Sequence, residues 1–167
     1  MAKKSLLLLR HAKSSWKNPE LDDRDRPLNV RGRLAADRIG RLLVEERLIP
    51  DLVLCSTAKR TCETAVLVFT EQVTSPTILY RHDLYHAEPI QIADILSQIA
   101  EPVQCVMIIG HNPGLEDFLT QQTGETLSLP TGALARIDFE LDTWGQFNDV
   151  LLGTLVQHWR PRELESD

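Results

Sequence analysis

The feature that most constrains this fold is a pair of short apolar runs with almost no polar interruption. Residues 5–9 contain four leucines in succession, and residues 103–109 (VQCVMII) form the longest strand-like run of the chain. Runs of this kind indicate strands buried on both faces, because a strand with one wet face alternates apolar and polar residues. We therefore predict a sheet that other elements cover on both sides.

Helical and strand patterns alternate along the rest of the chain. Helical apolar spacing is found in residues 30–48, 58–70, 89–100 and 115–122. Ser56 or Thr57 is a suitable N-cap for the second of these helices. Further strands are predicted at 51–55, 77–80, 134–141 and 150–158, with a turn around 144–145 between the last two. This order predicts an α/β sheet with helices on both faces and at least one antiparallel pair near the end.

Composition limits the class of protein. The chain of 167 residues, with 43% hydrophobic and 25% charged residues, indicates one soluble domain spanning 1–167. A net charge of −6 argues against broad nucleic-acid binding. The leucine run is too short for a signal peptide, and no stretch approaches the ~20 apolar residues of a membrane helix. Three cysteines without CxxC spacing are typical of reduced thiols, so we expect a cytoplasmic protein.

Basic residues follow three of the predicted strands. Arg10 and His11 come directly after the first run, and Arg60 lies in the first turn of the helix after the second strand. His111 follows the long strand, in the segment GHNPG. Ligands of open α/β sheets bind outside the carboxyl ends of the strands. We therefore expect two arginines and two histidines to meet at one rim of the sheet.

These residue types suit the chemistry of a phosphoryl group. An arginine presents a fork of donors that matches phosphate oxygens, and it is permanently charged. A neutral histidine can attack phosphorus, and neighbouring positive charge lowers its pKa. A second, protonated histidine can hydrogen-bond the oxygens as negative charge develops. The set predicts phosphoryl transfer through a covalent phosphohistidine on the enzyme.

Several ordered motifs resemble those of the histidine phosphatase superfamily, the phosphoglycerate-mutase-like phosphatases. They are LLLLRHAKSSW (6–16), DRPLNVRGRLAA (25–36), DLVLCSTAKRTCETA (51–65), LYHA (84–87) and IIGHNPGLEDF (108–118). Together they look like the SixA-type branch, the phosphohistidine phosphatases, and they cover essentially the whole chain. The resemblance implies a three-layer α/β/α sandwich with a mostly parallel central sheet and an antiparallel edge strand. It implies His11 as the nucleophile, in a phosphate pocket of Arg10, Arg60 and His111, with no metal or organic cofactor.

Five further polar residues are candidates for smaller roles. The resemblance suggests hydroxyl contacts from Ser14 and Thr57, although capping its helix explains Thr57 equally well. Many members of the superfamily use a Glu after the third strand to protonate an alcohol leaving group, and His86 stands at that position here. Glu88, His86 or Asp83 remains a candidate general acid. A phosphohistidine substrate has an imidazole leaving group and depends less on such an acid.

The predicted function is that of a phosphatase acting on a phosphohistidine-bearing protein, such as a phosphorelay domain. A small-molecule phosphomonoesterase and a non-catalytic module that binds phosphate or a phosphoprotein are the alternatives. A metal hydrolase has weak support, since the spaced histidines of HDLYH (82–86) come without HExxH or clustered cysteines. The charged run 22–26 reads as a solvated loop, with a place at the pocket rim as the alternative. No membrane or nucleic-acid partner is expected, and the oligomeric state, with a monomer as one option, stays open.

Overall fold

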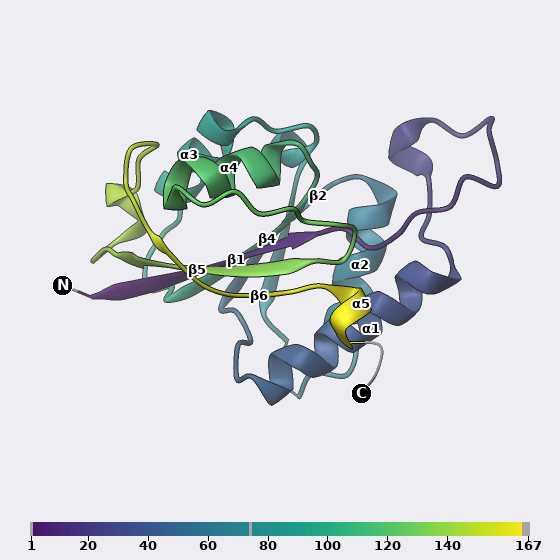
Figure 1. Ribbon diagram of the computed structural model, residues 1–167, viewed down its shortest axis with the longest axis horizontal. Coiled ribbons are helices and arrows are strands. Elements are labelled where there is room, and N and C mark those ends of the chain that lie inside the picture. Colours follow the sequence, from purple (N-terminus) through teal and green to yellow (C-terminus); the bar gives the residue numbers. More distant parts are fainter. Residues whose placement is uncertain (1, 74, 165–167) are drawn as a thin grey trace.

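A six-stranded mixed sheet forms the centre of the protein (Figure 1). The computed structural model describes residues 2–73 and 75–164. The strands are β1 (Lys3–Arg10), β2 (Leu52–Ser56), β3 (Thr77–Arg81), β4 (Cys105–Gly110), β5 (Leu134–Glu140) and β6 (Thr154–Trp159). Their order is β3-β2-β4-β1-β5-β6, and β5 pairs antiparallel with both of its neighbours. The edge strand β6 is thus antiparallel to its neighbour. The strand that runs opposite to the others is β5, the second strand from that edge.

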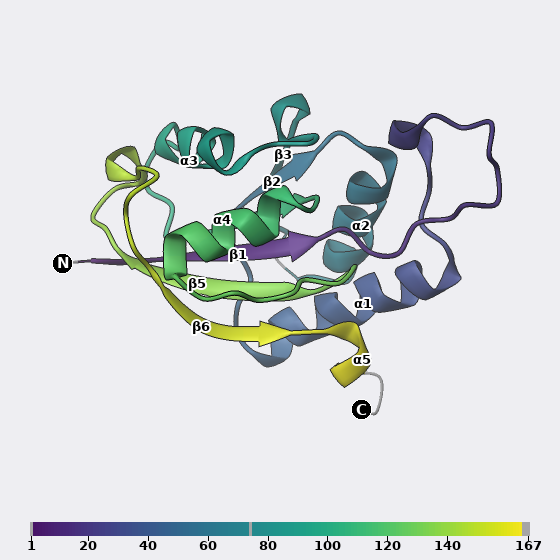
Figure 2. The ribbon, with the colours of Figure 1, turned by 45° about the horizontal axis from the view of Figure 1, so that its top comes forward.

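Helices cover both faces of this sheet (Figures 1 and 2). One face carries α3 (Pro89–Ser97) and α4 (Gly114–Thr123), and the other carries α1 (Val30–Glu45), α2 (Lys59–Phe69) and the short α5 (Pro161–Leu164). This confirms the predicted three-layer α/β fold. Three 3₁₀ turns, at Asp23–Asp25, His82–Leu84 and Trp144–Gln146, and α5 were not predicted, because segments of three or four residues carry no periodic signal.

The leucine run of β1 is buried on both faces, as predicted. Leu6 and Leu8 pack in the core beneath α3 and α4, while Leu7 and Leu9 pack toward α1 and α2. All four side chains are fully buried. Burial of a leucine stabilises a fold by about 1.5–3 kcal/mol, so the two cores together hold β1 firmly in the centre of the sheet. The segment that follows β1 therefore begins from a fixed point.

The register between β1 and β4 places two histidines at the same level. Arg10 is opposite Gly110 in the parallel ladder, and the backbone N–H of His11 donates to the Gly110 carbonyl at 3.1 Å. His11 and His111 are thus the first residues beyond two adjacent strand ends. β2 lies on the other side of β4, so Ser56, its last residue, ends beside the same point.

The first turn of α1 packs directly against the backbone that follows His11. Asn29 caps the helix by accepting from the Gly32 N–H, and its own N–H donates to the Lys13 carbonyl at 2.9 Å. A Cβ added at Gly32 would lie 2.1 Å from that carbonyl oxygen, well inside van der Waals contact. Glycine at this position is what allows α1 to support the segment carrying His11.

We predict that Gly32→Ala lowers the free energy of unfolding by about 1–3 kcal/mol, the usual cost of an overpacked contact. Helix propensity alone predicts the opposite effect on stability, because alanine is a better helix former than glycine. Urea denaturation measures the effect, and Gly145→Ala is the matched control, because its Cβ would meet its nearest neighbour at 3.8 Å. Equal stability of the two variants would contradict the role assigned to this contact.

Among the helices of residues 2–73 and 75–164, none has the length and apolar character needed to cross a membrane.

Candidate active site

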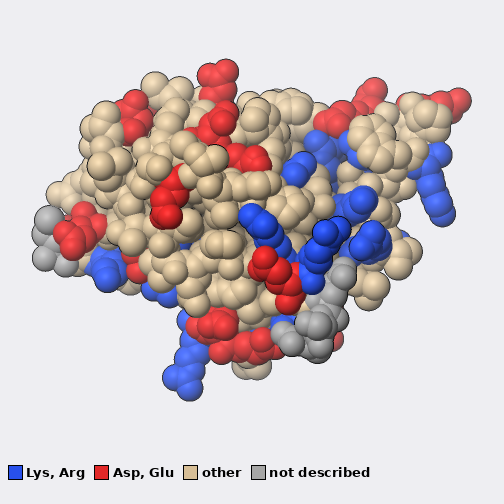
Figure 3. All heavy atoms as spheres, viewed as in Figure 1, with Lys and Arg blue, Asp and Glu red and all other residues tan. Residues whose placement is uncertain are grey.

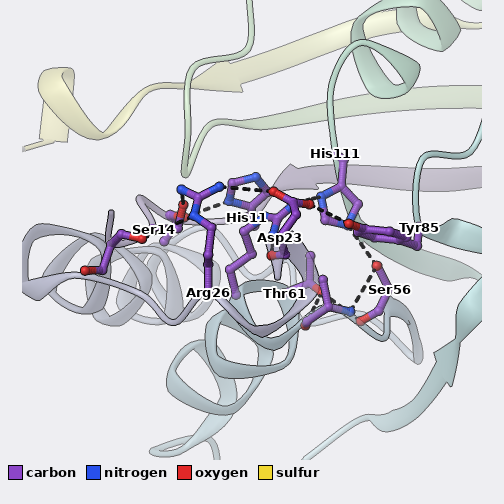
Figure 4. A network of polar contacts seen from close by, with 12 residues as sticks. His11, Ser14, Asp23, Arg26, Ser56, Thr61, Tyr85 and His111 are labelled. Carbon is purple, nitrogen blue, oxygen red and sulfur yellow. Dashed lines mark hydrogen bonds and ion pairs between the residues drawn. The ribbon is translucent and has the colours of Figure 1, made fainter. Parts of the chain in front are cut away.

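The four basic residues predicted from three strand ends do lie close together. Figure 4 shows two of them, His11 and His111, within a network of polar contacts. The rings of His11 and His111 lie 5.3 Å apart between centroids, and Arg60 Nη2 lies 3.4 Å from His111 Nδ1. The charges of Arg60 and Arg10 both act on His11. The side chains of His11, Arg60 and His111 are buried, although all three are polar or charged. Burial of such groups needs a compensating partner, and it marks this rim as a functional site.

The His11 ring is neutral, and one of its two nitrogens keeps an unprotonated lone pair. Its Nδ1 lies 2.8 Å from the Ala12 carbonyl oxygen, which can only accept, so Nδ1 carries the proton and Nε2 keeps its lone pair. Burial lowers the pKa of His11 to about 4, with the charges of Arg60 and Arg10 acting in the same direction. The hydrogen bond to Ala12 opposes this shift without reversing it. Nε2 is therefore available as a nucleophile at neutral pH.

His111 has the opposite tautomer. A guanidinium only donates, so Arg60 Nη2 requires His111 Nδ1 to accept, and Nε2 then donates to Ser56 Oγ at 2.8 Å. Burial, with the charges of His11 and Arg60, lowers the pKa of His111 to about 3. The predicted role uses a protonated ring as negative charge develops on the oxygens, and the arrangement in this structure holds the ring neutral. A phosphoryl dianion would bring the negative charge that raises this pKa.

Arg10 carries a buried donor that has no acceptor within the described part of the chain. Its Nη1 donates to the Leu129 carbonyl at 3.1 Å, but its buried Nε makes no hydrogen bond. Burial also lowers the pKa of this guanidinium, with Arg60 adding to the effect. An unsatisfied buried donor is costly, and an oxyanion is the partner that satisfies it best.

Asp23 occupies the donor fork of Arg60. Arg60 donates from Nη1 to the Asp23 carbonyl oxygen at 2.6 Å and from Nη2 to Oδ2 at 2.9 Å. The Tyr85 hydroxyl donates to the same Oδ2, and Arg26 Nη1 donates to Oδ1 at 3.2 Å. The hydrogen bond from Tyr85, followed by those from Arg60 and Arg26, holds the pKa of this carboxyl well below its usual range. The carboxylate and the main-chain carbonyl of Asp23 thus each hold one of the donors that a phosphoryl group would use.

The interpretation of residues 22–26 as a solvated loop is wrong for Arg26, whereas Asp23 is exposed as predicted and still contacts Arg60. The alternative, a place at the pocket rim, is what the structure has for both residues. Arg26 is buried, and its guanidinium lies 3.2 Å from the centre of the Trp16 ring. It also donates to the Ser14 hydroxyl. Alternating charges within a short loop gave no signal that assigns these two residues, rather than their neighbours, to the pocket rim.

The predicted hydroxyl contacts divide into two cases. Ser14 is buried and joins the site through Arg26. Thr57 faces a different set of residues, because its Oγ1 accepts from Arg24 Nη2 at 2.8 Å and lies 3.5 Å from His82 Nδ1.

The predicted N-cap of α2, Ser56 or Thr57, is wrong. The helix begins after Ala58, which makes no side-chain cap. Ser56 uses its hydroxyl as the acceptor for His111 instead. Sequence reasoning missed Ser56 in this role, along with Asp23, Arg26 and Tyr85. The signals available were the place of Ser56 at the end of β2 and that of Tyr85 in the LYHA segment.

The three candidate acids have different surroundings. Asp83 forms a two-bond ion pair with Arg81, and the hydrogen bond from Arg81 lowers the pKa of this carboxyl. Glu88 is exposed and is the N-cap residue of α3. His86 is exposed in a left-handed backbone conformation, φ 59°, with its ring 4.0 Å from that of Tyr85 and 6.0 Å from that of His111. Of the three, His86 is the residue whose ring lies close to rings of the pocket.

The pair of histidines in HDLYH does not form a helical metal-binding pair. His82 lies in a 3₁₀ turn that ends at Leu84, and the chain then turns through the positive φ of His86. Their rings also have different neighbours, Thr57 for His82 and Tyr85 for His86. The spacing that suggested a zinc pair on a helix therefore belongs to a turn.

Comparison with known proteins agrees with this geometry. Residues 6–81 match the Histidine phosphatase superfamily (branch 1). An uncharacterised chloroplastic protein of Arabidopsis thaliana is 32% identical over 150 residues, covering 83% of this chain and 68% of its own. The SixA structure from Agrobacterium tumefaciens is 32% identical, with a TM-score of 0.79 over 95% of this chain and 99% of that one. SixA from Nakamurella multipartitia, at 24% identity, shares the fold with a TM-score of 0.84, covering 96% and 98%.

Two histidines and two arginines lie together at one end of an α/β sandwich, and the matched family is one of phosphatases. The protein is therefore a phosphatase. The chain belongs to the histidine phosphatase superfamily, and within it to the SixA-type branch.

The tautomers of the two histidines can be tested directly. At about pH 5.5 an ordinary histidine, with a pKa near 6.5, is mostly protonated. The lowered pKa values of about 4 and about 3 predict that His11 and His111 stay neutral at this pH. Ring ¹⁵N chemical shifts should show the proton on Nδ1 of His11 and on Nε2 of His111. The same protein in urea supplies the protonated reference, and an imidazolium signal from either ring in the folded protein would contradict the assignment.

The contact between Asp23 and Arg60 predicts an effect on anion binding. Asp23→Asn removes a negative charge that competes with phosphate for the Arg60 donors, so the affinity for inorganic phosphate should rise on the order of tenfold. Asp25→Asn is the matched control, since it removes the same charge from an exposed residue in the same 3₁₀ turn. Titration calorimetry measures both variants. Unchanged or weaker phosphate binding by Asp23→Asn would show that Asp23 does not compete for this site.

Proposed function

We propose that this protein hydrolyses phosphohistidine on a protein substrate through a covalent phosphohistidine at His11. One observation carries the proposal: the Ala12 carbonyl fixes the His11 proton on Nδ1 and leaves Nε2 unprotonated beside Arg60 and Arg10. A neutral nucleophile among permanent positive charges is suited to attack on an anionic phosphoryl group.

The proposed reaction has two displacements at phosphorus. In the first, His11 Nε2 forms a bond to phosphorus while the P–N bond to the substrate imidazole breaks, and that imidazole takes a proton from solvent. In the second, the oxygen of a water molecule bonds to phosphorus while the bond to Nε2 breaks. The water proton goes to solvent, and the products are dephosphorylated histidine and inorganic phosphate, with His11 restored.

The pocket supplies donors for the phosphoryl oxygens. The buried Arg10 Nε has no partner in the described structure and is one such donor. Arg60 supplies two more once the phosphoryl group replaces Asp23 on its fork. His111 lies beside Arg60, and the added negative charge favours its protonated, donating form.

The surroundings of the candidate acids support a phosphoramidate substrate. Imidazole is a better leaving group than an alkoxide and needs less help from a carboxylic acid. Asp83 is paired with Arg81, and Glu88 is exposed at the start of α3, whereas the candidate whose ring lies near rings of the pocket is His86, which is not a carboxylic acid. The solved relative from Agrobacterium tumefaciens, at 32% identity, is described as a "putative phosphohistidine phosphatase SixA", which supports the same substrate.

The proposed setting is the cytoplasm, with a phosphorelay protein as the substrate. Cys55, Cys62 and Cys105 are free thiols. Free thiols suit a reducing compartment.

Substitution of the nucleophile tests the function. His11→Ala should release phosphate from a ³²P-phosphohistidine protein at least roughly a thousandfold more slowly than the wild type, while still binding inorganic phosphate. The wild type should carry an acid-labile, alkali-stable label during turnover. His158→Ala, an exposed histidine on β6, is the matched control and should behave as wild type.

The same assay separates the alternatives. Activity of His11→Ala equal to wild type would overturn the mechanism. A higher kcat/KM on phosphate monoesters than on phosphohistidine would keep the mechanism and replace the substrate. Turnover should survive EDTA, and a loss that zinc restores would favour the metal hydrolase. Tight phosphate binding without turnover of any substrate would identify a binding module.

A further inference from the structure

A basic groove lies beside the pocket. It has a volume of about 460 Å³, and four of its lining residues are cationic, Lys13, Arg31, Arg160 and Arg162. Among the described residues that line the groove, Glu163 is the single carboxylate. This excess of positive charge occurs in a chain whose net charge is −6. The groove is therefore positively charged although the protein as a whole is negative. A positive surface attracts partners that carry negative charge.

The groove and the phosphate pocket share a wall. The carbonyls of two consecutive residues, Ser128 and Leu129, accept from Arg160 on the groove side and from Arg10 on the pocket side. Lys13, which lines the groove, is only two residues beyond the proposed nucleophile. The groove therefore begins within a few residues of the proposed phosphoryl site.

The sheet topology explains why the two sites are adjacent. β1 and β6 both pair antiparallel with β5, so both strands end at the same edge of the sheet. The residues after β6 that line the groove thus lie at the same edge as the residues after β1. Figure 3 shows lysine and arginine side chains gathered on this face, in the region where α5 and α1 lie in Figure 1.

We propose that the basic groove binds an acidic segment of the phosphoprotein substrate, next to its phosphohistidine. This proposal rests on the proposed function and adds the kind of surface that the substrate presents. Charge complementarity and continuity with the pocket identify the occupant, because an acidic segment meets Lys13, Arg160 and Arg162 while its phosphoryl group meets His11. Attraction of this kind favours encounter and selects among partners.

Two histidine peptides, phosphorylated with phosphoramidate, test the groove. They differ only in their flanks, with three glutamates in one and three lysines in the other. The wild type should have a kcat/KM about tenfold higher on the acidic peptide, and salt should weaken this preference. Arg162→Glu should lower kcat/KM on the acidic peptide and raise it on the basic one, so that the ratio falls to about one or below. Lys13→Glu is a second, independent variant with the same expectation.

Lys3→Glu is the matched control, because Lys3 is exposed and begins β1 at the opposite end of the strand. Its peptide ratio should equal that of the wild type. A ratio that Arg162→Glu and Lys13→Glu leave unchanged, or that Lys3→Glu lowers equally, would overturn the groove while leaving the proposed function intact. If the wild type hydrolysed neither peptide, the proposed function would fail, and the groove proposal would fail with it.

Discussion

The site depends on the hydrogen-bonded register between β1 and β4. Two cores fix β1 by burying its leucines alternately above and below the sheet, and Arg10 then faces Gly110. A shift of one residue would turn each leucine toward the other core and move His11 away from the level of His111. The chemistry at the strand ends is therefore held in place by packing that extends over the whole strand, with no need for the loops themselves to be rigid.

Burial of positive charge gives the pocket its character. Two arginines and two histidines cannot all be charged in a buried space without a counter-charge, because desolvation penalises every ion. The histidines respond by becoming neutral, and Asp23 supplies a carboxylate to Arg60. The neutral ring of His11, the proposed nucleophile, and the carboxylate at Arg60 are two consequences of the same electrostatic constraint.

The sequence predicted the parts of this protein that periodicity and strand order control. All six strands, the four longer helices and the meeting of Arg10, His11, Arg60 and His111 follow from apolar patterning and from the rule that strand ends form the site. The contacts of Asp23 and Arg26 could not be predicted, because they depend on how an irregular loop folds back over α2. Propensity predicts Ser56 or Thr57 as the helix N-cap, whereas in the folded chain the Ser56 hydroxyl is hydrogen-bonded to His111.

The proposed exchange of Asp23 for a phosphoryl group would have a consequence for turnover. A carboxylate has one negative charge and is hydrated on its exposed side, whereas a phosphoryl dianion has two and can also satisfy the buried Arg10 Nε. The dianion is therefore the stronger partner for the pocket, but its net gain is reduced by the contacts that Asp23 gives up. An internal competitor of this kind limits how tightly inorganic phosphate is held after hydrolysis. We infer that Asp23 favours product release as well as stabilising Arg60 before substrate binds.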